Sequence, residues 1–224
     1  MSVGFRVLSR ERSVSLEQVS RFRGLPVANI SDSMGRMAAG GTRLRPYHEG
    51  GYMVGSAITV KARPGDNLML HYALNIAEAG DVIVVDAGGD LTNALIGELM
   101  LRFAEKKGLA GVVIDGAIRD LESIEKSSLP VYAAGVTHRG PYKDGPGEIN
   151  VSIAIDGMVV HPGDLIVGDK DGVLSIPYDQ IEFVYELASK RHQDEIAKLA
   201  AIDSGRNDRS WVEAKLKNLG CELV

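Results

Sequence analysis

Apolar residues follow two different spacings along this chain, one typical of helices and one typical of buried strands. Residues 14–37 carry them at helical spacing, and Pro26 divides the segment, so we expect two short helices there. From residue 51 the run YMVGSAITVKA predicts a strand. A PGD turn follows it, and the carboxylate of Asp66 in this turn can cap the next predicted helix, NLMLHYALNIAEAG.

The order of strand followed by helix recurs further along the chain. DVIVVDAGGD is typical of a buried strand that ends in a glycine-rich bend, and we expect a helix over TNALIGELMLRFAEKKG, capped by Thr92 and stopped by Gly108. AGVVIDGAIRD is a second apolar strand, which leads through a short helix, LESIEKSS, to the strand PVYAAGVT. Strands that alternate with helices predict an α/β layer whose apolar strands are covered on both faces.

The pattern changes after residue 137, where glycine- and proline-bearing β structure predicts a second sheet. The segments 80–86 and 163–169, GDVIVVD and GDLIVGD, share a turn, a strand and a terminal aspartate, but two copies do not establish a repeat architecture. A long helix is expected from Tyr178 to about residue 202, and a last helix lies around 211–219. We therefore expect one domain over 1–224, with a C-terminal helical extension over about 178–224.

Composition and charge narrow the functional classes. With 224 residues, 45% of them hydrophobic, the chain can bury one sizeable core, and its formal net charge of −5 argues against binding nucleic acid through phosphates. The one cysteine, Cys221, excludes an intrachain disulfide and favours a reducing compartment. The N-terminus lacks an apolar signal core, and no apolar run approaches the roughly 20 residues needed to cross a bilayer. We expect a cytoplasmic protein without a membrane partner.

The first group of residues that suggests chemistry follows the strand that ends at Asp86. The bend leads toward a predicted helical segment that contains Gly97, Glu98, Leu99 and Met100. Backbone amides near a helix start carry partial positive charge and have no partner inside the helix, so they suit a carboxylate or a phosphate. The alternative is that Gly88 and Gly89 merely form a tight turn.

The second group lies at the end of the next strand, where Arg119 and Asp120 are adjacent. Ligands of open α/β layers tend to bind beyond the carboxyl ends of strands. Arginine offers a rigid fork for a carboxylate or an enolate, and aspartate offers a hard oxygen ligand for a divalent ion. The alternative is that Asp120 caps the helix beginning at Leu121 while Arg119 forms a surface ion pair.

Other chemistries have less support in the sequence. There is neither a G-x-G-x-x-G fingerprint nor a P-loop lysine, the five histidines lack zinc-ligand spacing, and no G-x-S-x-G elbow is present. A Schiff-base aldolase needs a desolvated lysine, and polar or glycine-rich segments surround Lys61, Lys106, Lys107, Lys143 and Lys170. Any aldol chemistry should therefore use a metal.

Four runs resemble the RraA-like family across about residues 25–180: GSAITVKARPGDNLMLHYAL, GDVIVVDAGGD, GELMLRFAEKKGLAGVVIDGAIRD and GDLIVGDKDGV. Within that family the chain resembles the class II 4-hydroxy-4-methyl-2-oxoglutarate aldolases, lyases that release pyruvate and commonly also decarboxylate oxaloacetate. The resemblance implies a layered β/β/α unit like the swivelling domain, with N- and C-terminal helices, assembled as a homotrimer or a homohexamer. The family also has a non-enzymatic branch, the regulators of ribonuclease E activity, and a protein-binding regulator is therefore the alternative.

The aldolase branch has a signature of Gly, about twenty residues, Arg-Asp, two residues and then Asp or Glu. Arg119 and Asp120 match it, whereas Ser123 stands at the last acidic position and Glu122 lies one residue too early. By resemblance, Arg119 would hold the carboxylate and keto oxygen of a small 2-keto acid, and Asp120 would bind Mg²⁺ or Mn²⁺ directly. Amides around Gly97 to Met100 would hold the substrate, with Glu98 and Asp86 fixing waters of the metal.

The resemblance also points to the long C-terminal helix. In the aldolase branch an acidic residue from a neighbouring subunit reaches the water shell of the metal, and Glu195 lies at about the matching distance beyond Asp120. Asp194 is the near rival. The alternative is that both are ordinary solvated charges, with Glu195 pairing with Arg191 or Lys198 at helical spacing.

Overall fold

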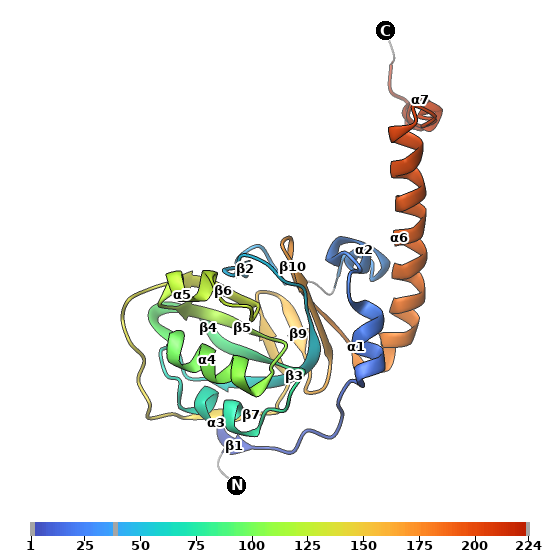
Figure 1. Cartoon of the computed structure of the whole chain (residues 1–224). Coiled ribbons are helices and arrows are strands. Elements are labelled where there is room, and N and C mark those ends of the chain that lie inside the picture. Colours follow the sequence, from blue (N-terminus) through green and yellow to red (C-terminus); the bar gives the residue numbers. More distant parts are fainter. Residues whose placement is uncertain (1–2, 38–39, 223–224) are drawn as a thin grey trace.

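The structure is a computed structural model that describes residues 3–37 and 40–222, and a nine-stranded mixed sheet forms its centre (Figure 1). Four parallel strands lie side by side in the middle: β3 (Met53–Ala62), β4 (Asp81–Ile96), β5 (Gly111–Ile118) and β6 (Val131–Val136). The other strands are β1 (Phe5–Val7), β2 (Arg45–Pro46), β7 (Gly147–Ile149), β8 (Ile153–Ile155), β9 (Met158–Val160), β10 (Leu165–Asp169) and β11 (Gly172–Ile176).

Helices cover one face of the central sheet, and further strands and helices cover the other. Alternate residues of a strand point to opposite faces. Val85 and Ile114 accordingly join the core beneath α3 (Leu68–Ile76), α4 (Glu98–Lys107) and α5 (Leu121–Glu125). Val84 and Val113 join the core beneath α1 (Leu16–Phe22), α2 (Val27–Ser33), β8 to β11 and the start of α6 (Ile181–Asp203). The expected layered α/β fold with N- and C-terminal helices is confirmed.

Two local predictions about helix starts are also confirmed. Pro26 separates α1 from α2 and stands at the N-cap of α2. The carboxylate of Asp66 accepts a hydrogen bond from the backbone N–H of Leu68 at 2.9 Å, at the start of α3. A buried strand and a capped helix therefore form where the spacing predicts them.

The helix expected from Thr92 is wrong at its start. β4 does not end at the glycine bend but continues to Ile96, and α4 begins only at Glu98. The reason is tertiary pairing, because the second half of β4 forms a ladder with β5 in which Ala94 faces Ala117, after register shifts beyond Asp86. Asp86 therefore lies inside a strand and not at its end.

The second sheet expected after residue 137 forms only in part. Among the described residues, β8 and β9 make a separate two-stranded sheet, whereas β7, β10 and β11 belong to the main one. β3 is ten residues long, and the edge that faces away from β4 pairs with β10 near its start and with β7 near its end. The length of β3 therefore places β7 and β10 in the main sheet, although the sequence pattern predicted them in a second sheet.

The C-terminal helices extend away from the body (Figure 1). A 3-10 turn, Tyr178–Gln180, leads into α6, whose first half buries Ile181, Val184 and Ala188 against the body, whereas residues 193–200 are all exposed. α7 (Ser210–Asn218) follows at the far end. In the described part of the chain no helix is both long and apolar enough to span a membrane.

Candidate active site

The ends of β4 and β5 bring Gly97, Glu98, Arg119 and Asp120 together, although twenty residues separate the two pairs in the chain. The backbone N–H of Arg119 donates to the carbonyl of Ile96 at 3.0 Å, which joins the two strand ends. The backbone N–H of Glu98 donates to Oδ2 of Asp120 at 2.9 Å. Neighbouring parallel strands therefore place the two sequence motifs at one edge of the sheet.

Asp120 has a backbone conformation that few residues with a side chain adopt. Its φ of 58° and ψ of 45° lie in the left-handed region, which Asp and Asn tolerate better than most residues. Asp120 occupies the N-cap position of α5, but its side chain makes no capping hydrogen bond there. The capping alternative for this side chain is therefore wrong, because the carboxylate turns toward α4 instead. Unusual backbone geometry of this kind clusters at functional sites.

The start of α4 supplies donors without acceptors inside the helix. The first hydrogen bond within α4 runs from Leu101 N–H to the carbonyl of Gly97 at 3.1 Å, so the amides of Leu99 and Met100 precede it. Both residues line a pocket of about 140 Å³, together with Gly97 and Arg119. The pocket thus combines helix-terminal amides with a guanidinium group, which suits a small carboxylate.

Three further residues of this pocket were missed in the sequence: Asn67, His71 and Lys143. Asn67 is 2% exposed; its Nδ2 donates to the carbonyl of Leu95 at 2.8 Å, while Oδ1 has no hydrogen-bond partner among the described residues. Burial, together with the charge of Lys143, lowers the pKa of His71, which favours a neutral ring at pH 7. The available signal for Asn67 and His71 was their spacing of four residues, which places them on one face of the predicted helix.

The charged side chains of the site are partly exposed and loosely paired. Nε of Arg119 lies 3.7 Å from Oδ2 of Asp120, and the two side chains are 41% and 43% exposed. The carboxylate of Glu98 accepts from Arg102 at 2.7 Å, one helical turn along α4. Exposed pairs of this kind are weak, so all three charged groups can reorient toward a ligand.

The structure does not bring Asp86 and Glu195 to this pocket. Asp86 forms an ion pair with Lys61 at 2.5 Å and lines a different cavity, so its expected role beside Asp120 is corrected. Glu195 lies on α6, which packs on α1 and α2, away from α4 (Figure 1). Its carboxylate accepts from Nδ2 of Asn29 at 2.8 Å, while Arg191 pairs with Asp32 at 3.3 Å.

The carboxylates of Asp120 and Glu98, beside the pocket, fit a hard divalent ion. Within residues 3–37 and 40–222, no three His, Cys, Asp or Glu side chains are grouped so that they could hold a metal. Asp120 nevertheless presents one carboxylate oxygen, Oδ1, outside the hydrogen bonds found in this part of the chain, and Glu98 is adjacent. Mg²⁺ is commonly held by one or two carboxylates, with waters and substrate oxygens as its other ligands. The carboxylate oxygens of these two residues favour Mg²⁺ or Mn²⁺.

Comparisons with known proteins identify relatives of this chain. A protein of Halalkalibacterium halodurans, provisionally named 4-hydroxy-4-methyl-2-oxoglutarate aldolase, is 41% identical over 199 residues, which cover 88% of this chain and 95% of that protein. The 4-hydroxy-4-methyl-2-oxoglutarate aldolase of Thermus thermophilus is 38% identical over 112 residues, which cover 50% of this chain and 68% of that protein.

Solved structures share the fold. An uncharacterized protein from Pseudomonas syringae pv. tomato superposes with a TM-score of 0.79 and 26% identity, covering 88% of this chain and 93% of that one. The RNA-processing inhibitor RraA from Thermus thermophilus superposes with a TM-score of 0.63 and 32% identity, covering 68% of this chain and 92% of that one. The model of the RraA-like family, described as Aldolase/RraA, matches residues 27–175, and this chain therefore belongs to the RraA-like family.

Proposed function

We propose that this chain is a divalent-metal-dependent aldolase that cleaves 4-hydroxy-4-methyl-2-oxoglutarate, or a related 4-hydroxy-2-keto acid, and also decarboxylates oxaloacetate. The relatives named as 4-hydroxy-4-methyl-2-oxoglutarate aldolases support an aldolase function. The observation that carries the proposal is that Arg119 and the amides at the start of α4 line one small pocket, directly beside Asp120, whose carboxylate accepts from the N–H of Glu98.

Arg119 and the start of α4 would bind the keto acid end of the substrate. The planar guanidinium of Arg119 can donate to the carboxylate and the adjacent keto oxygen together, and the amides of Leu99 and Met100 can donate to the remaining carboxylate oxygen. Lys143 and the neutral ring of His71 line the same pocket, so they offer a cation and a hydrogen-bonding group to a second carboxylate. This donor set suits a dicarboxylic substrate.

Asp120 would hold Mg²⁺ or Mn²⁺ directly, with Glu98 and, from a second copy of the chain, Glu195 holding its waters. When bound, the cation supplies Lewis acidity to the keto group and stabilises the negative charge that develops on its oxygen. Arg119 would add a second positive charge at the same oxygen.

The aldol cleavage breaks the bond between C3 and C4 of the substrate. The proton of the 4-hydroxyl passes to a base, C4 becomes the carbonyl carbon of one pyruvate, and the electron pair of the broken bond forms the enolate of the second pyruvate, which a proton then quenches at carbon. A carboxylate close to the hydroxyl, such as Glu98, can accept the first proton directly or through one water. Decarboxylation of oxaloacetate gives the same enolate and needs no such base, so one pocket serves both reactions.

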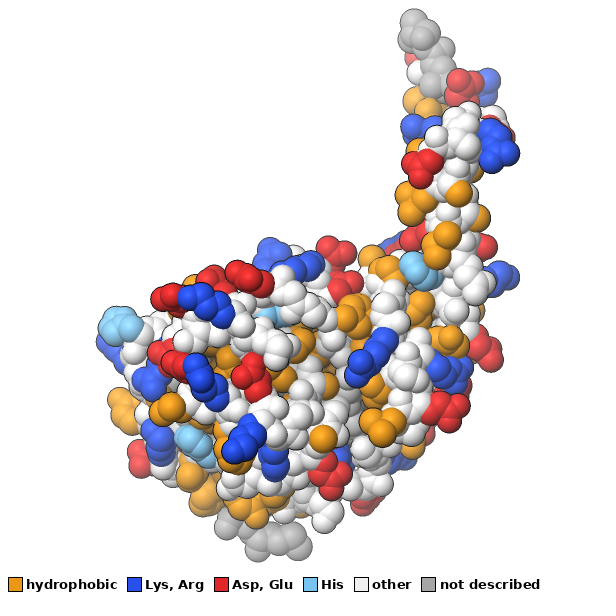
Figure 2. Space-filling view, in the orientation of Figure 1, with side chains coloured by type: hydrophobic (Ala, Val, Ile, Leu, Met, Phe, Trp, Pro, Cys, Tyr) orange, Lys and Arg blue, Asp and Glu red, His pale blue; other side chains and the backbone are white. Residues whose placement is uncertain are grey.

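A homotrimer or homohexamer is part of this proposal. The half of α6 that leaves the body exposes Ile196, Leu199 and Ile202, and Trp211 is exposed on α7. Figure 2 shows hydrophobic side chains distributed along this protruding segment. A helix that packs against nothing gains little stability from its apolar residues, so a second copy that covers them would stabilise it. Closed symmetric assembly is the common solution for such surfaces.

The second candidate function is that of a protein-binding regulator of ribonuclease E. It is favoured by the structural similarity to the RNA-processing inhibitor RraA from Thermus thermophilus. Such a role would use surface complementarity and would not need Arg119 or Asp120. The two functions therefore differ in how they respond to substitutions in the pocket.

Pyruvate release from oxaloacetate and from 4-hydroxy-4-methyl-2-oxoglutarate, followed with a coupled assay, tests the proposal. We expect turnover with Mg²⁺ or Mn²⁺ and its loss after chelation, with recovery when the metal is returned. Full turnover after exhaustive chelation would exclude the metal-dependent mechanism. Inhibition of ribonuclease E without release of pyruvate from either substrate would favour the regulator instead.

A further inference from the structure

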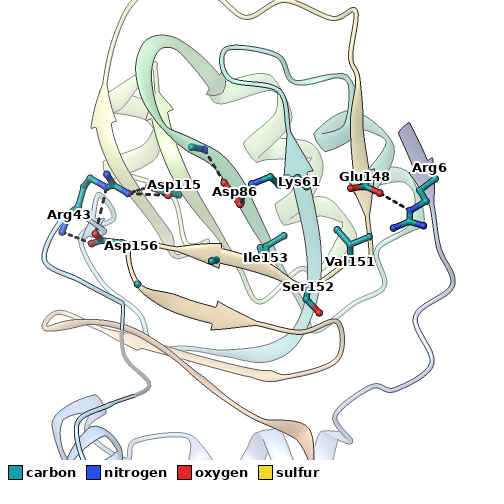
Figure 3. A pocket seen from close by; sticks show the side chains of 13 residues that line it. Arg6, Arg43, Lys61, Asp86, Asp115, Glu148, Val151, Ser152, Ile153 and Asp156 are labelled. Carbon is teal, nitrogen blue, oxygen red and sulfur yellow. Dashed lines mark hydrogen bonds and ion pairs between the residues drawn. The ribbon is translucent and has the colours of Figure 1, made fainter. Parts of the chain in front are cut away.

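A second polar cavity, of about 730 Å³, lies where β3, β4 and β5 meet the β8–β9 hairpin (Figure 3). Three cations and four carboxylates line it, which leaves a net charge of −1. Five of these groups form a continuous row, namely Lys61, Asp86, Asp115, Arg43 and Asp156. The remaining two, Arg6 and Glu148, pair with each other at 2.6 Å on the far wall.

The strand register creates this row. Lys61 on β3 faces Asp86 on β4, and Asp86 faces Asp115 on β5, so the three side chains lie on one face of the sheet. Two residues earlier on the same strands, Val84 and Val113 belong to the core between the sheet and β8 to β11. The row therefore lies on the opposite face from α4 and the pocket of Arg119.

One cation stands on each side of the two central carboxylates of the row. Nζ of Lys61 lies 2.5 Å from Asp86, and Nη2 of Arg43 donates to Oδ2 of Asp115 at 3.1 Å. Arg43 also reaches the hairpin, since its backbone N–H donates to Asp156 at 3.0 Å. Asp86 and Asp115 are thus direct neighbours with no cation between them. Like charges directly opposite each other on adjacent strands destabilise a sheet.

Asp115 is almost completely buried at this point of the row. The residue is 2% exposed, and Nη2 of Arg43 lies 2.9 Å from its Oδ1 and 3.1 Å from its Oδ2. Burial raises the pKa of Asp115, and the charges of Asp86 and Asp156 add to this effect while Arg43 opposes it. Two adjacent buried carboxylates with no cation between them form a position that a cationic group can neutralise.

We propose that this cavity binds a free α-amino acid, whose ammonium lies between the carboxylates of Asp86 and Asp115 and whose carboxylate accepts from Lys61. The net charge of −1 and the two adjacent carboxylates favour a cationic donor. An inorganic ion is disfavoured, because no three metal-ligating side chains are grouped in the part of the chain that the structure describes. Since cations flank the two carboxylates, the same molecule must also carry an anionic group, and an α-amino acid has both on one carbon.

Calorimetric titration and thermal unfolding of the full chain, with each of the twenty proteinogenic amino acids at about 5 mM, test this inference. We expect at least one to bind with a Kd below about 1 mM and to raise Tm. Two analogues with the same side chain as the bound amino acid test whether the cavity binds the carboxylate and the ammonium. The amine that lacks the carboxylate and the 2-hydroxy acid that lacks the ammonium should each bind about tenfold more weakly or worse.

Asp115→Asn keeps the size of the side chain and removes its charge, so it should weaken binding of the amino acid at least about tenfold. If circular dichroism shows that Asp115→Asn does not fold, Lys61→Met is the second variant, and it should weaken binding by a similar factor. Asp120→Asn is the matched control in the other pocket and should bind like the parent chain. The inference is overturned if no amino acid binds, if the folded variants of the cavity bind as the parent does, or if the amine or potassium ions bind as tightly as the amino acid.

Discussion

Oδ2 of Asp120 occupies the space in which residue 97 would carry a β-carbon: an ideal Cβ built on Gly97 lies 2.3 Å from that oxygen and 2.9 Å from Cγ of Arg119. The φ of Gly97 is −147°, so the backbone would accept other residues, and only the close approach requires glycine. The same oxygen accepts from the N–H of Glu98. Because residue 97 has no side chain, Asp120 and Arg119 have room to lie at the start of α4.

Gly97→Ala should displace Asp120 and Arg119 without unfolding the chain, because both side chains are partly exposed and can move. We expect kcat/KM for pyruvate release to fall about a hundredfold, or about 2.7 kcal/mol, since a displacement of about 1 Å is enough for such an effect. Gly50→Ala is the matched control, as its added Cβ meets no atom within 4 Å. Equal activity of the two variants would contradict the role of the close approach.

Asp120→Asn should abolish metal-dependent turnover while the fold remains. Asparagine tolerates the left-handed conformation and can still accept from the N–H of Glu98, so the free energy of unfolding should change by less than about 1 kcal/mol. The lost charge should reduce kcat at least about a hundredfold. Asp171→Asn, on an exposed turn, is the control. Near-normal turnover of Asp120→Asn would mean that the metal is held elsewhere.

Arg119→Lys should be severely impaired even though the positive charge is kept. A guanidinium binds a carboxylate and the neighbouring keto oxygen with one planar fork, whereas lysine offers one compact charge on a flexible stem. We expect kcat/KM to fall about a hundredfold, with kcat itself reduced. Arg102→Lys, whose partner Glu98 forms an exposed pair on α4, should change little. A raised KM with unchanged kcat would limit Arg119 to substrate binding.

Glu195 should act in the pocket of a second copy. α6 carries Glu195 away from α4 of its own chain. Mixing inactive Asp120→Asn chains with inactive Glu195→Ala chains should therefore restore activity, because some pockets then receive both intact residues. Native mass spectrometry would verify that mixed oligomers form, and Asp194→Ala is the neighbouring control. Full activity of Glu195→Ala alone, or inactive mixed oligomers, would remove Glu195 from the site.

His48 should make stability depend on pH. It is 3% exposed beside the ring of Tyr132, and burial lowers its pKa below the ordinary value of 6.5, with the charge of Lys170 acting in the same direction. The unfolded chain therefore binds this proton at higher pH than the folded chain does. The stabilisation is present above pH 6.5 and is lost as pH falls through the lower, folded-state pKa.

Urea unfolding from about pH 7 to about pH 5 measures this effect, and the free energy of unfolding should decrease over that range. His48→Gln, which retains a group able to bond the backbone of Val131, should flatten the dependence. His138→Gln removes an exposed histidine and should leave the slope as it is. Equal slopes for His48→Gln and the parent chain would assign the pH dependence to other groups.

Several features of this protein followed from the sequence alone. Apolar runs such as VIVV and GVVI predict strands buried on both faces, and their alternation with helical spacing predicts the layered α/β fold, because side-chain periodicity reports which faces are covered. The adjacency of Arg119 and Asp120 at a strand end likewise identified a candidate carboxylate and metal site without coordinates. These are local properties, set by residues close together in the chain.

Only the tertiary structure decided which distant residues meet. β4 runs on to Ile96 because β5 pairs with it, and this pairing overrides the helical spacing from Thr92. The register of β3, β4 and β5 places Asp86 beside Lys61 and Asp115. The same holds for Asn67, which lines the pocket of Arg119 only because α3 packs beside the end of β4. Strand register and helix packing are set by long-range contacts, and a one-residue change in register moves every side chain to the other face.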